Sequence, residues 1–316
     1  MPAAHLAALG LTGADPAWRA YAASLEPRAL DLPDGAALDA LLRRLGLTDE
    51  DRAELPGRVA AVLCDPAARW LAGVAAAALH EGVGRLSPDP AAPRWPLPPL
   101  ERPPGRAAYV TALLATVGSV RAEHARRGVP EDVSWLSLAE LGRQLRLHRR
   151  ATGRFGTDEP GWLANAWSGR LLTVGRLQGE YVDEATASLH IPETGPLAPE
   201  AVAESLARLR AGWPRWYGCA PRDWRCDSWL LDPALVEVLG ERSNIVRFQR
   251  RFVLVPGGER IADAGVLYFV FGRRDVAVPE GLGELPQRTR LERAVVERLK
   301  SGGHWVARVG RLAVGD

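Results

Sequence analysis

The residues that could do chemistry gather in segment 187–210, which begins A-S-L-H-I-P-E-T-G-P-L-A-P-E. His190 lies in a short apolar run that stops at Pro192, and Gly195 and Pro196 follow in a turn. A proline stops a strand because it cannot donate a ladder hydrogen bond. Histidine titrates near neutral pH, so this side chain could exchange a proton with a group held beside the turn.

A helix is predicted to begin directly after this turn. Pro199 suits the first turn of a helix, and Val202, Leu206 and Leu209 share one face. Backbone N–H groups at a helix start are unpaired and carry the positive end of the helix dipole, so an anion, most often a phosphate, is favoured there. The pattern predicts an anion-binding corner beside His190, although many strand–turn–helix corners bind nothing.

Composition limits the classes of protein that the chain can belong to. Its 316 residues suffice for two domains, and 47% hydrophobic with 25% charged residues is typical of a soluble globular protein. A net charge of +2 gives no reason to expect nucleic-acid binding. Cys64, Cys219 and Cys226 show no C-x-x-C spacing, which argues against a disulfide framework or a metal site. No signal peptide or membrane-length apolar run is evident, so we expect a cytoplasmic protein without membrane partners; its oligomeric state stays open.

The first part of the chain is predicted to be helical. Residues 1–84 read as helices, and the prolines of 87–104 predict an extended, semi-rigid linker. Helices are expected over 106–127 and, as one continuous element, over 133–150. We expect a helical N-terminal domain over 1–130, which includes this linker, and a second domain over 131–316. His148 is interpreted as part of a solvated helix end.

The second part of the chain alternates strands and helices. The sequence predicts a strand pair or one long bulged strand over 170–181, then the strand and helix of 187–210 and a strand over 224–231. A helix over 233–239 and a hairpin of strands 245–255 and 264–271 around Pro256-Gly257-Gly258 follow. A helix over 291–299 and a last strand near 305–309 end the list.

Four stretches in this order resemble a known family. They are G-R-L-Q at 175–178, L-H-I-P-E-T-G-P-L at 189–197, S-W-L-L-D-P at 228–233 and S-N-I-V-R-F-Q at 243–249. They are similar to the actinobacterial acyltransferase family, which pairs a helical N-acyltransferase N-terminal domain with a GNAT-like C-terminal domain. The resemblance implies an α+β fold, with the helical domain followed by a GNAT-like mixed β-sheet and flanking helices.

The resemblance also implies a donor, acetyl-CoA or a longer acyl-CoA. Its pantetheine arm would follow the strand that contains Leu189 and Ile191, and its pyrophosphate would meet the helix start near Gly195, Pro196 and Leu197. The loop departs from the superfamily pattern Q/R-x-x-G-x-G/A. Pro196 removes an N–H donor, and the nearby Glu193 adds an anion.

In this type of enzyme an amine attacks the thioester directly, so positioning and a base suffice. His190 is the candidate base; alternatively it is a strand-end residue that holds the loop. Ser228 could protonate the thiolate or cap the turn into Pro233, and Asp227 could orient His190, contact the amine or be solvated. The candidates for the substrate site are Trp229, Asn244 and Gln249. Trp229 could instead line the core or a groove, and Asn244 could instead form a cap or a turn.

The first hypothesis for function is an acyl-CoA-dependent acyltransferase, acting on an amine, or alternatively a hydroxyl, of a small molecule or peptide. The second is a catalytically silent GNAT-like module that binds an acyl ligand or a protein partner. The departure of the phosphate loop from the superfamily pattern favours this second hypothesis.

Overall fold

The computed structural model describes residues 2–87, 95–102, 104–273 and 275–313. The chain forms two compact units, Met1–Leu172 (unit 1) and Thr173–Asp316 (unit 2). The sequence prediction placed this boundary at residue 130. The structure instead groups 131–172 with the helical part, because the helices formed there pack on one another and on the helix that precedes them.

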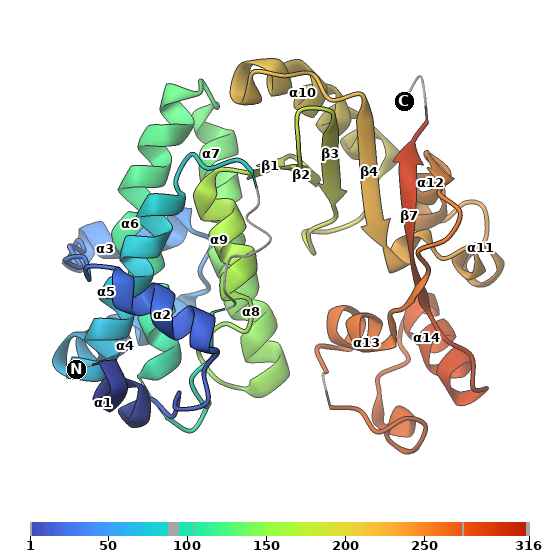
Figure 1. Cartoon of the computed structure of the whole chain (residues 1–316). Coiled ribbons are helices and arrows are strands. Elements are labelled where there is room, and N and C mark those ends of the chain that lie inside the picture. The colour runs from blue at the N-terminus through green and yellow to red at the C-terminus, as the bar shows by residue number, and fades with distance from the viewer. Residues whose placement is uncertain (1, 88–94, 103, 274, 314–316) are drawn as a thin grey trace. The chain divides into compact units, whose positions relative to one another are not determined.

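Unit 1 is helical, as the sequence predicts (Figure 1). Its helices are α1 (Pro2–Ala8), α2 (Pro16–Ser24), α3 (Gly35–Arg44), α4 (Asp49–Cys64), α5 (Pro66–Gly82), α6 (Gly105–Arg126), α7 (Glu131–Leu138), α8 (Glu140–Thr152) and α9 (Pro160–Ser168). Side-chain caps set the starts of α2, α4 and α5: Asp15 Oδ1 accepts the Ala17 N–H, Thr48 Oγ1 accepts the Asp51 N–H, and Asp65 Oδ1 accepts the N–H groups of Ala67 and Ala68.

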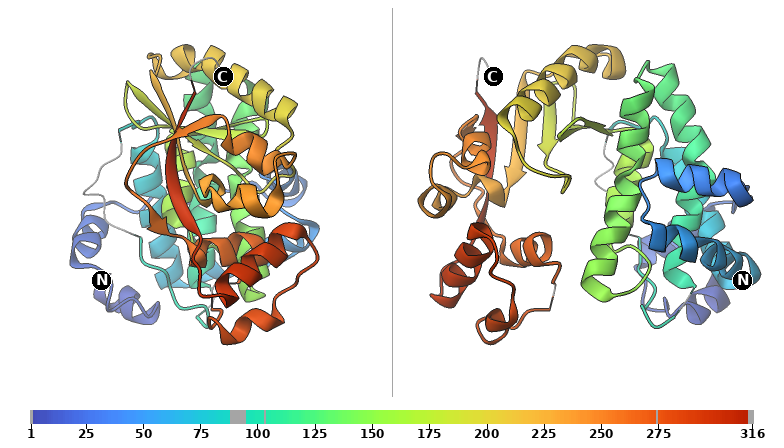
Figure 2. Two further views of the ribbon diagram at one scale, coloured as in Figure 1. Left: turned by 90° about the vertical axis from the view of Figure 1, so that its right-hand side faces the viewer. Right: turned by 180° about the vertical axis from the view of Figure 1, so that it is seen from behind.

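Helices α5 and α6 form the centre of unit 1, side by side in Figures 1 and 2. Both bury residues around much of their circumference, including Leu71 and Val74 of α5 and Val110 of α6. Part of the proline-rich segment 87–104 lies outside the described residues; in its described part the Pro96 carbonyl accepts the Tyr109 hydroxyl of α6. Among the described residues no single helix is long and apolar enough to cross a membrane, and only α4 and α5 together, bent by 102°, reach that length and composition.

The predicted helix over 133–150 is interrupted at Ala139. A continuous helix would have the Gly142 N–H donate to Leu138, but it donates to the carbonyl of Leu45, 3.1 Å away. The helix therefore ends and restarts as α7 and α8. The prediction of a solvated His148 is wrong: its side chain is fully buried, with Nδ1 3.1 Å from Asp158 Oδ2.

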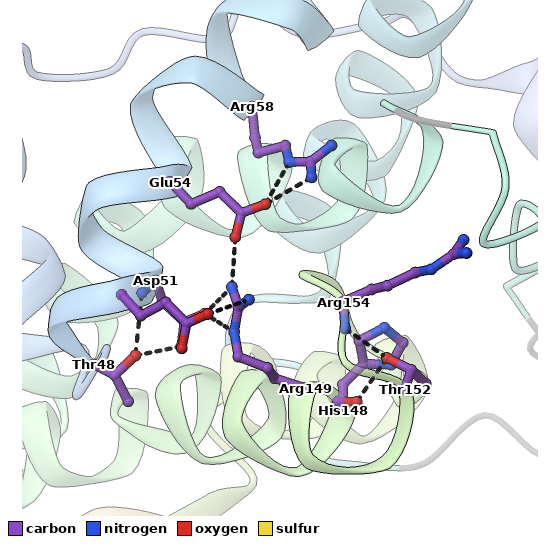
Figure 3. A network of polar contacts seen from close by, with 9 residues as sticks. Thr48, Asp51, Glu54, Arg58, His148, Arg149, Thr152 and Arg154 are labelled. Carbon is purple, nitrogen blue, oxygen red and sulfur yellow. Dashed lines mark hydrogen bonds and ion pairs between the residues drawn. The ribbon is translucent and has the colours of Figure 1, made fainter.

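A network of ion pairs joins α4 to α8 (Figure 3). The guanidinium of Arg149 contacts Asp51 at 2.7 Å and Glu54 at 2.6 Å, and Thr48 Oγ1 donates to the other oxygen of Asp51 at 2.9 Å. The Asp51 side chain is only 1% exposed. A buried carboxylate is tolerated when its oxygens are paired in this way, so the network ties the start of α4 to the end of α8.

Acid should destabilise unit 1 through His124 of α6, which is fully buried with Nδ1 2.8 Å from Ser134 Oγ. Burial, reinforced by the charges of Arg127 and Arg121, lowers the pKa of His124 from 6.5 to about 3. The unfolded chain therefore binds a proton that the folded chain excludes, and stability that is complete above pH 6.5 is lost as the pH falls towards 3. We expect His124 to account for a loss of about 2 kcal/mol between pH 8 and pH 5.

Urea denaturation at pH 8, 6.5 and 5 measures this loss. His124→Gln retains an amide that can bond to Ser134 but does not titrate, so its unfolding free energy should fall less over this range than that of the wild type. Parallel pH dependences of the two proteins would contradict the assignment.

Unit 2 is built on a mixed sheet with the strand order β1-β2-β3-β4-β7-β5, and β6 pairs with β7 off this path. The strands are β1 (Leu171–Val174), β2 (Leu177–Tyr181), β3 (Thr186–His190), β4 (Asp223–Ser228), β5 (Phe252–Leu254), β6 (Arg260–Ile261) and β7 (Val306–Leu312); β1 spans the division between the units. The helices are α10 (Pro199–Tyr217), α11 (Ala234–Leu239), α12 (Asn244–Gln249), α13 (Asp263–Phe271) and α14 (Arg290–Lys300). The α+β class and the strand–turn–helix of 187–210 are confirmed, and β7 lies between β4 and the helices α11 and α12 in the right-hand view of Figure 2.

The predicted hairpin of 245–255 and 264–271 is wrong. Residues 245–249 of its first strand belong to α12, only the three residues of β5 form a strand after it, and its second strand is α13. Both β5 and β6 pair with β7 rather than with each other. The buried residues of 245–255 are Val246, Phe248, Gln249 and Phe252. Val246 and Gln249 are three residues apart and Phe248 and Phe252 are four apart, which is also helical spacing. A short apolar run does not separate the two periods, and packing against the core decided for helix.

Candidate functional site

His190 at the end of β3 is paired with a carboxylate from the neighbouring strand. In the antiparallel register Gln178 faces His190 and Glu180 faces Ser188, so Glu180 and His190 lie diagonally on one side of the sheet. His190 Nε2 lies 2.8 Å from Glu180 Oε2. An ionised carboxylate only accepts, so Nε2–H donates, and in this tautomer Nδ1 carries the lone pair that can take a proton.

The two parallel strands of the sheet end beside this pair. Strands β3 and β4 are in register from Thr186–Asp223 to Leu189–Cys226, and the pairing of these described residues ends there. His190 and Asp227 come next on each strand, past the last paired residues. Ligands in sheets of this kind bind beyond the carboxyl ends of parallel strands, which is where His190 lies.

Asp227 and Ser228 make contacts that differ from the catalytic roles predicted for them, which were to orient His190 and to protonate the thiolate. Arg260 binds both oxygens of Asp227, at 2.7 and 2.9 Å, whereas the carboxylate on His190 is Glu180. Ser228 Oγ accepts the Leu230 N–H at 3.1 Å and caps a 3₁₀ turn, the structural alternative that the sequence left open. Successive strand residues face opposite sides of the sheet, so Ser228 also faces away from the side of His190.

The loop between β3 and α10 leaves the start of that helix without a side-chain cap. The N-cap residue is Ala198, and Pro199 follows it. Gly195 and Pro196 are exposed, Ile191 is half-buried, and Leu189 and Leu197 are buried. The first amides of α10 thus have no side-chain cap beside an exposed turn, and the binding of an anion there stays a prediction.

The three substrate-site candidates lie in or beside the packing of α11 and α12. Trp229 packs edge-on against Trp305 in the apolar cluster of unit 2. Gln249 is buried and donates to the Asp232 carbonyl at 2.7 Å, and Asn244 is the half-buried first residue of α12. The structure therefore gives Trp229 and Gln249 structural partners.

Two residues of the site were missed by sequence reasoning, namely Glu180 and Arg176. Arg176 lies in the turn between β1 and β2, and its guanidinium donates to carbonyls of the loop before α10. Arg176 belongs to the stretch G-R-L-Q, which the sequence singled out without giving Arg176 a role. The register of the sheet brings Glu180 next to His190, and it also brings the β1–β2 turn next to the loop before α10.

Comparison with protein-family models finds two domains in the chain. Residues 36–169 match the N-acyltransferase N-terminal domain, and residues 171–312 match the GNAT-like C-terminal domain. No curated protein matches the chain.

Three solved structures of acyltransferases are similar along nearly the whole chain. One, in complex with decanoyl-CoA, is 34% identical with a TM-score of 0.89, and the match covers 98% of each chain. A second, with decanoyl-CoA and teicoplanin, is 36% identical with a TM-score of 0.84 over 99% of each chain. The third, with CoA and 10C-teicoplanin, is 35% identical with a TM-score of 0.84 over 98% of each chain. The chain therefore belongs to the family of acyl-CoA-dependent acyltransferases that combine an N-acyltransferase N-terminal domain with a GNAT-like C-terminal domain.

Proposed function

We propose that this acyltransferase transfers a long acyl group from its CoA thioester to an amine of a glycopeptide. One relative about one-third identical binds decanoyl-CoA together with teicoplanin, which fits a donor with an acceptor. Another binds CoA together with 10C-teicoplanin, which fits the two products of a transfer. The observation that carries the proposal in this chain is the His190–Glu180 pair at the end of β3, directly before the uncapped start of α10.

The donor is proposed to lie along the end of β3 and the loop that follows. Leu189 and Ile191 would contact the pantetheine arm, and Gly195, Pro196 and Leu197 would lie beside the pyrophosphate. The uncapped amides of α10 support this placement, because they offer N–H donors and a positive dipole to phosphate oxygens.

His190 is proposed as the general base. As the acceptor nitrogen attacks the thioester carbonyl, a proton passes from that nitrogen to Nδ1 of His190, and Nε2–H keeps its bond to Glu180. The carboxylate stabilises the imidazolium and holds the tautomer, a role like that of the acid in other His–acid pairs. Collapse of the tetrahedral intermediate breaks the C–S bond, forms the amide and releases CoA thiolate, which takes up a proton. Ser228 and Asp227 are assigned no step.

Donor binding can be tested by thermal melting with acetyl-CoA and decanoyl-CoA. A ligand that binds only the folded state stabilises it by about 2.7 kcal/mol at 100 times its Kd. If only two more methylenes of the decanoyl chain are buried, they contribute about 1.6 kcal/mol, roughly tenfold in Kd. Decanoyl-CoA should therefore raise the melting temperature at lower concentration than acetyl-CoA does. No shift with either thioester would contradict the donor assignment.

Transfer itself is tested by incubating the enzyme with decanoyl-CoA and a glycopeptide that has a free amine, and measuring the mass of the product by mass spectrometry. A product heavier by one decanoyl group, with release of one CoA thiol, is expected. Binding of decanoyl-CoA without acylation of any glycopeptide amine would contradict the acceptor and favour the binding-module hypothesis.

A further inference from the structure

Arg176 is joined to the loop before α10 by hydrogen bonds to three carbonyls. Its Nη1 donates to Pro192 O at 2.7 Å, Nη2 donates to Gly195 O at 2.8 Å, and Nε lies 3.1 Å from both Gly195 O and Pro196 O. The guanidinium fork spans the whole turn, from the end of the strand to the residue before Leu197.

The backbone of Arg176 is anchored as well. Its N–H donates to Ser205 Oγ of α10 at 2.8 Å, and Ser205 is buried. Gly175, just before it, has a φ of +58°, which a glycine adopts without strain, and a Cβ there would lie 2.7 Å from Ser205 Oγ. The backbone of Arg176 is thus bonded to α10, and its guanidinium is bonded to the loop that leads into the same helix.

The charge of Arg176 is not neutralised by a neighbouring carboxylate. No ion pair links it to an acid in the part of the chain that the structure describes, and its bonds go to neutral carbonyls. Burial lowers the pKa of Arg176 from its usual value, with no acidic group acting against it. A half-buried cation without a counter-ion is costly unless an anion of the bound state supplies one.

The bonds of Arg176 also set the direction of a backbone donor. The C=O and N–H of a trans peptide point in opposite directions, so binding of the Pro196 carbonyl turns the Leu197 N–H away from the arginine. Over the described residues the Leu197 N–H makes no hydrogen bond. It lies in the loop directly before the uncapped start of α10.

We propose that Arg176 is a positioning residue for the donor pyrophosphate, which holds the 192–197 loop so that the unbonded Leu197 N–H stays at the start of α10 and which leaves a positive charge beside it. The loop departs from the superfamily pattern at Glu193 and Pro196, and Arg176 compensates for the lost donor and the added anion. The inference rests on the proposed function, since it requires a CoA donor at the start of α10.

The test compares two donors that share the thioester but differ in phosphates, namely decanoyl-CoA and decanoyl-pantetheine. For Arg176→Gln we expect KM and Kd for decanoyl-CoA to rise roughly tenfold or more, the size of effect for a lost charge-assisted contact. The KM for decanoyl-pantetheine and kcat with either donor should change less than about threefold. Arg176→Lys keeps the charge but loses the forked guanidinium, so its KM for decanoyl-CoA should lie between those of the wild type and Arg176→Gln.

Arg293→Gln is the matched control. Arg293 also donates to two loop carbonyls before a helix, those of Gln287 and Arg288, but that helix, α14, has a complete capping box at Thr289 and Glu292. This control should leave both KM values unchanged. Equal rises in KM for the two donors with Arg176→Gln, or no rise for decanoyl-CoA, would overturn the proposal. Failure of the wild type to use decanoyl-CoA would instead refute the proposed function, whatever Arg176 does.

Discussion

Replacement of His190 by glutamine should lower kcat for acyl transfer about 100-fold or more, with little change in KM for acyl-CoA. A positioned general base contributes typically about 10²- to 10⁴-fold, and glutamine cannot take up the proton that the attacking amine loses. Because the amide of glutamine can still bond to Glu180, the strand end should keep its structure. Steady-state kinetics with decanoyl-CoA and a glycopeptide acceptor measure the effect.

The carboxylate partner separates this role from a structural one. Glu180→Gln keeps a hydrogen bond to His190 but removes the charge that stabilises the imidazolium, so kcat should fall by a smaller factor, roughly tenfold, with KM unchanged. His304 offers a matched control in the same unit, because its Nδ1 lies 2.7 Å from Asp263 in an exposed pair. His304→Gln should leave kcat unchanged. A His190→Gln variant that turns over at the rate of His304→Gln would leave His190 with only the role of holding the loop.

Replacement of Arg149 by methionine should destabilise the protein by about 3 kcal/mol. The change removes the guanidinium that pairs with Asp51 and Glu54, while the buried Asp51 keeps its hydrogen bond from Thr48 (Figure 3). Breaking a buried pair from one side costs about 3–5 kcal/mol, and the helix start that remains near Asp51 moderates the cost. The shift of the urea denaturation midpoint measures it.

Two further variants make this prediction specific. In the double variant Asp51→Asn with Arg149→Met no unpaired buried carboxylate remains, so it should recover part of the loss. Arg43→Met removes an exposed ion pair with Asp39, in which the side chains are 60% and 45% exposed, and should cost less than about 1 kcal/mol. If Arg149→Met were no more destabilising than Arg43→Met, the α4–α8 network would not stabilise the fold.

The sequence by itself determined the elements whose signals are local. Thr48 and Asp65 start α4 and α5 as caps, and Pro192 and Pro199 separate β3 from α10. Such signals act within one turn or one strand end, through fixed backbone angles and missing or unpaired N–H groups, so they can be read without the rest of the chain. The same is true of the uncapped start of α10, because it follows directly from Ala198 and Pro199.

Tertiary structure decided the partners. Glu180 lies ten residues before His190 and contacts it only because β2 and β3 pair in one particular register. Asp227, the carboxylate that the sequence offered to orient His190, binds Arg260 instead. Packing likewise turned 244–249 and 263–271 into helices, although their aromatic and branched residues favour strands, since a short apolar run satisfies either period and the core that it meets selects one. Side-chain contacts between elements depend on register and packing, and neither can be predicted from the spacing of residues along one segment.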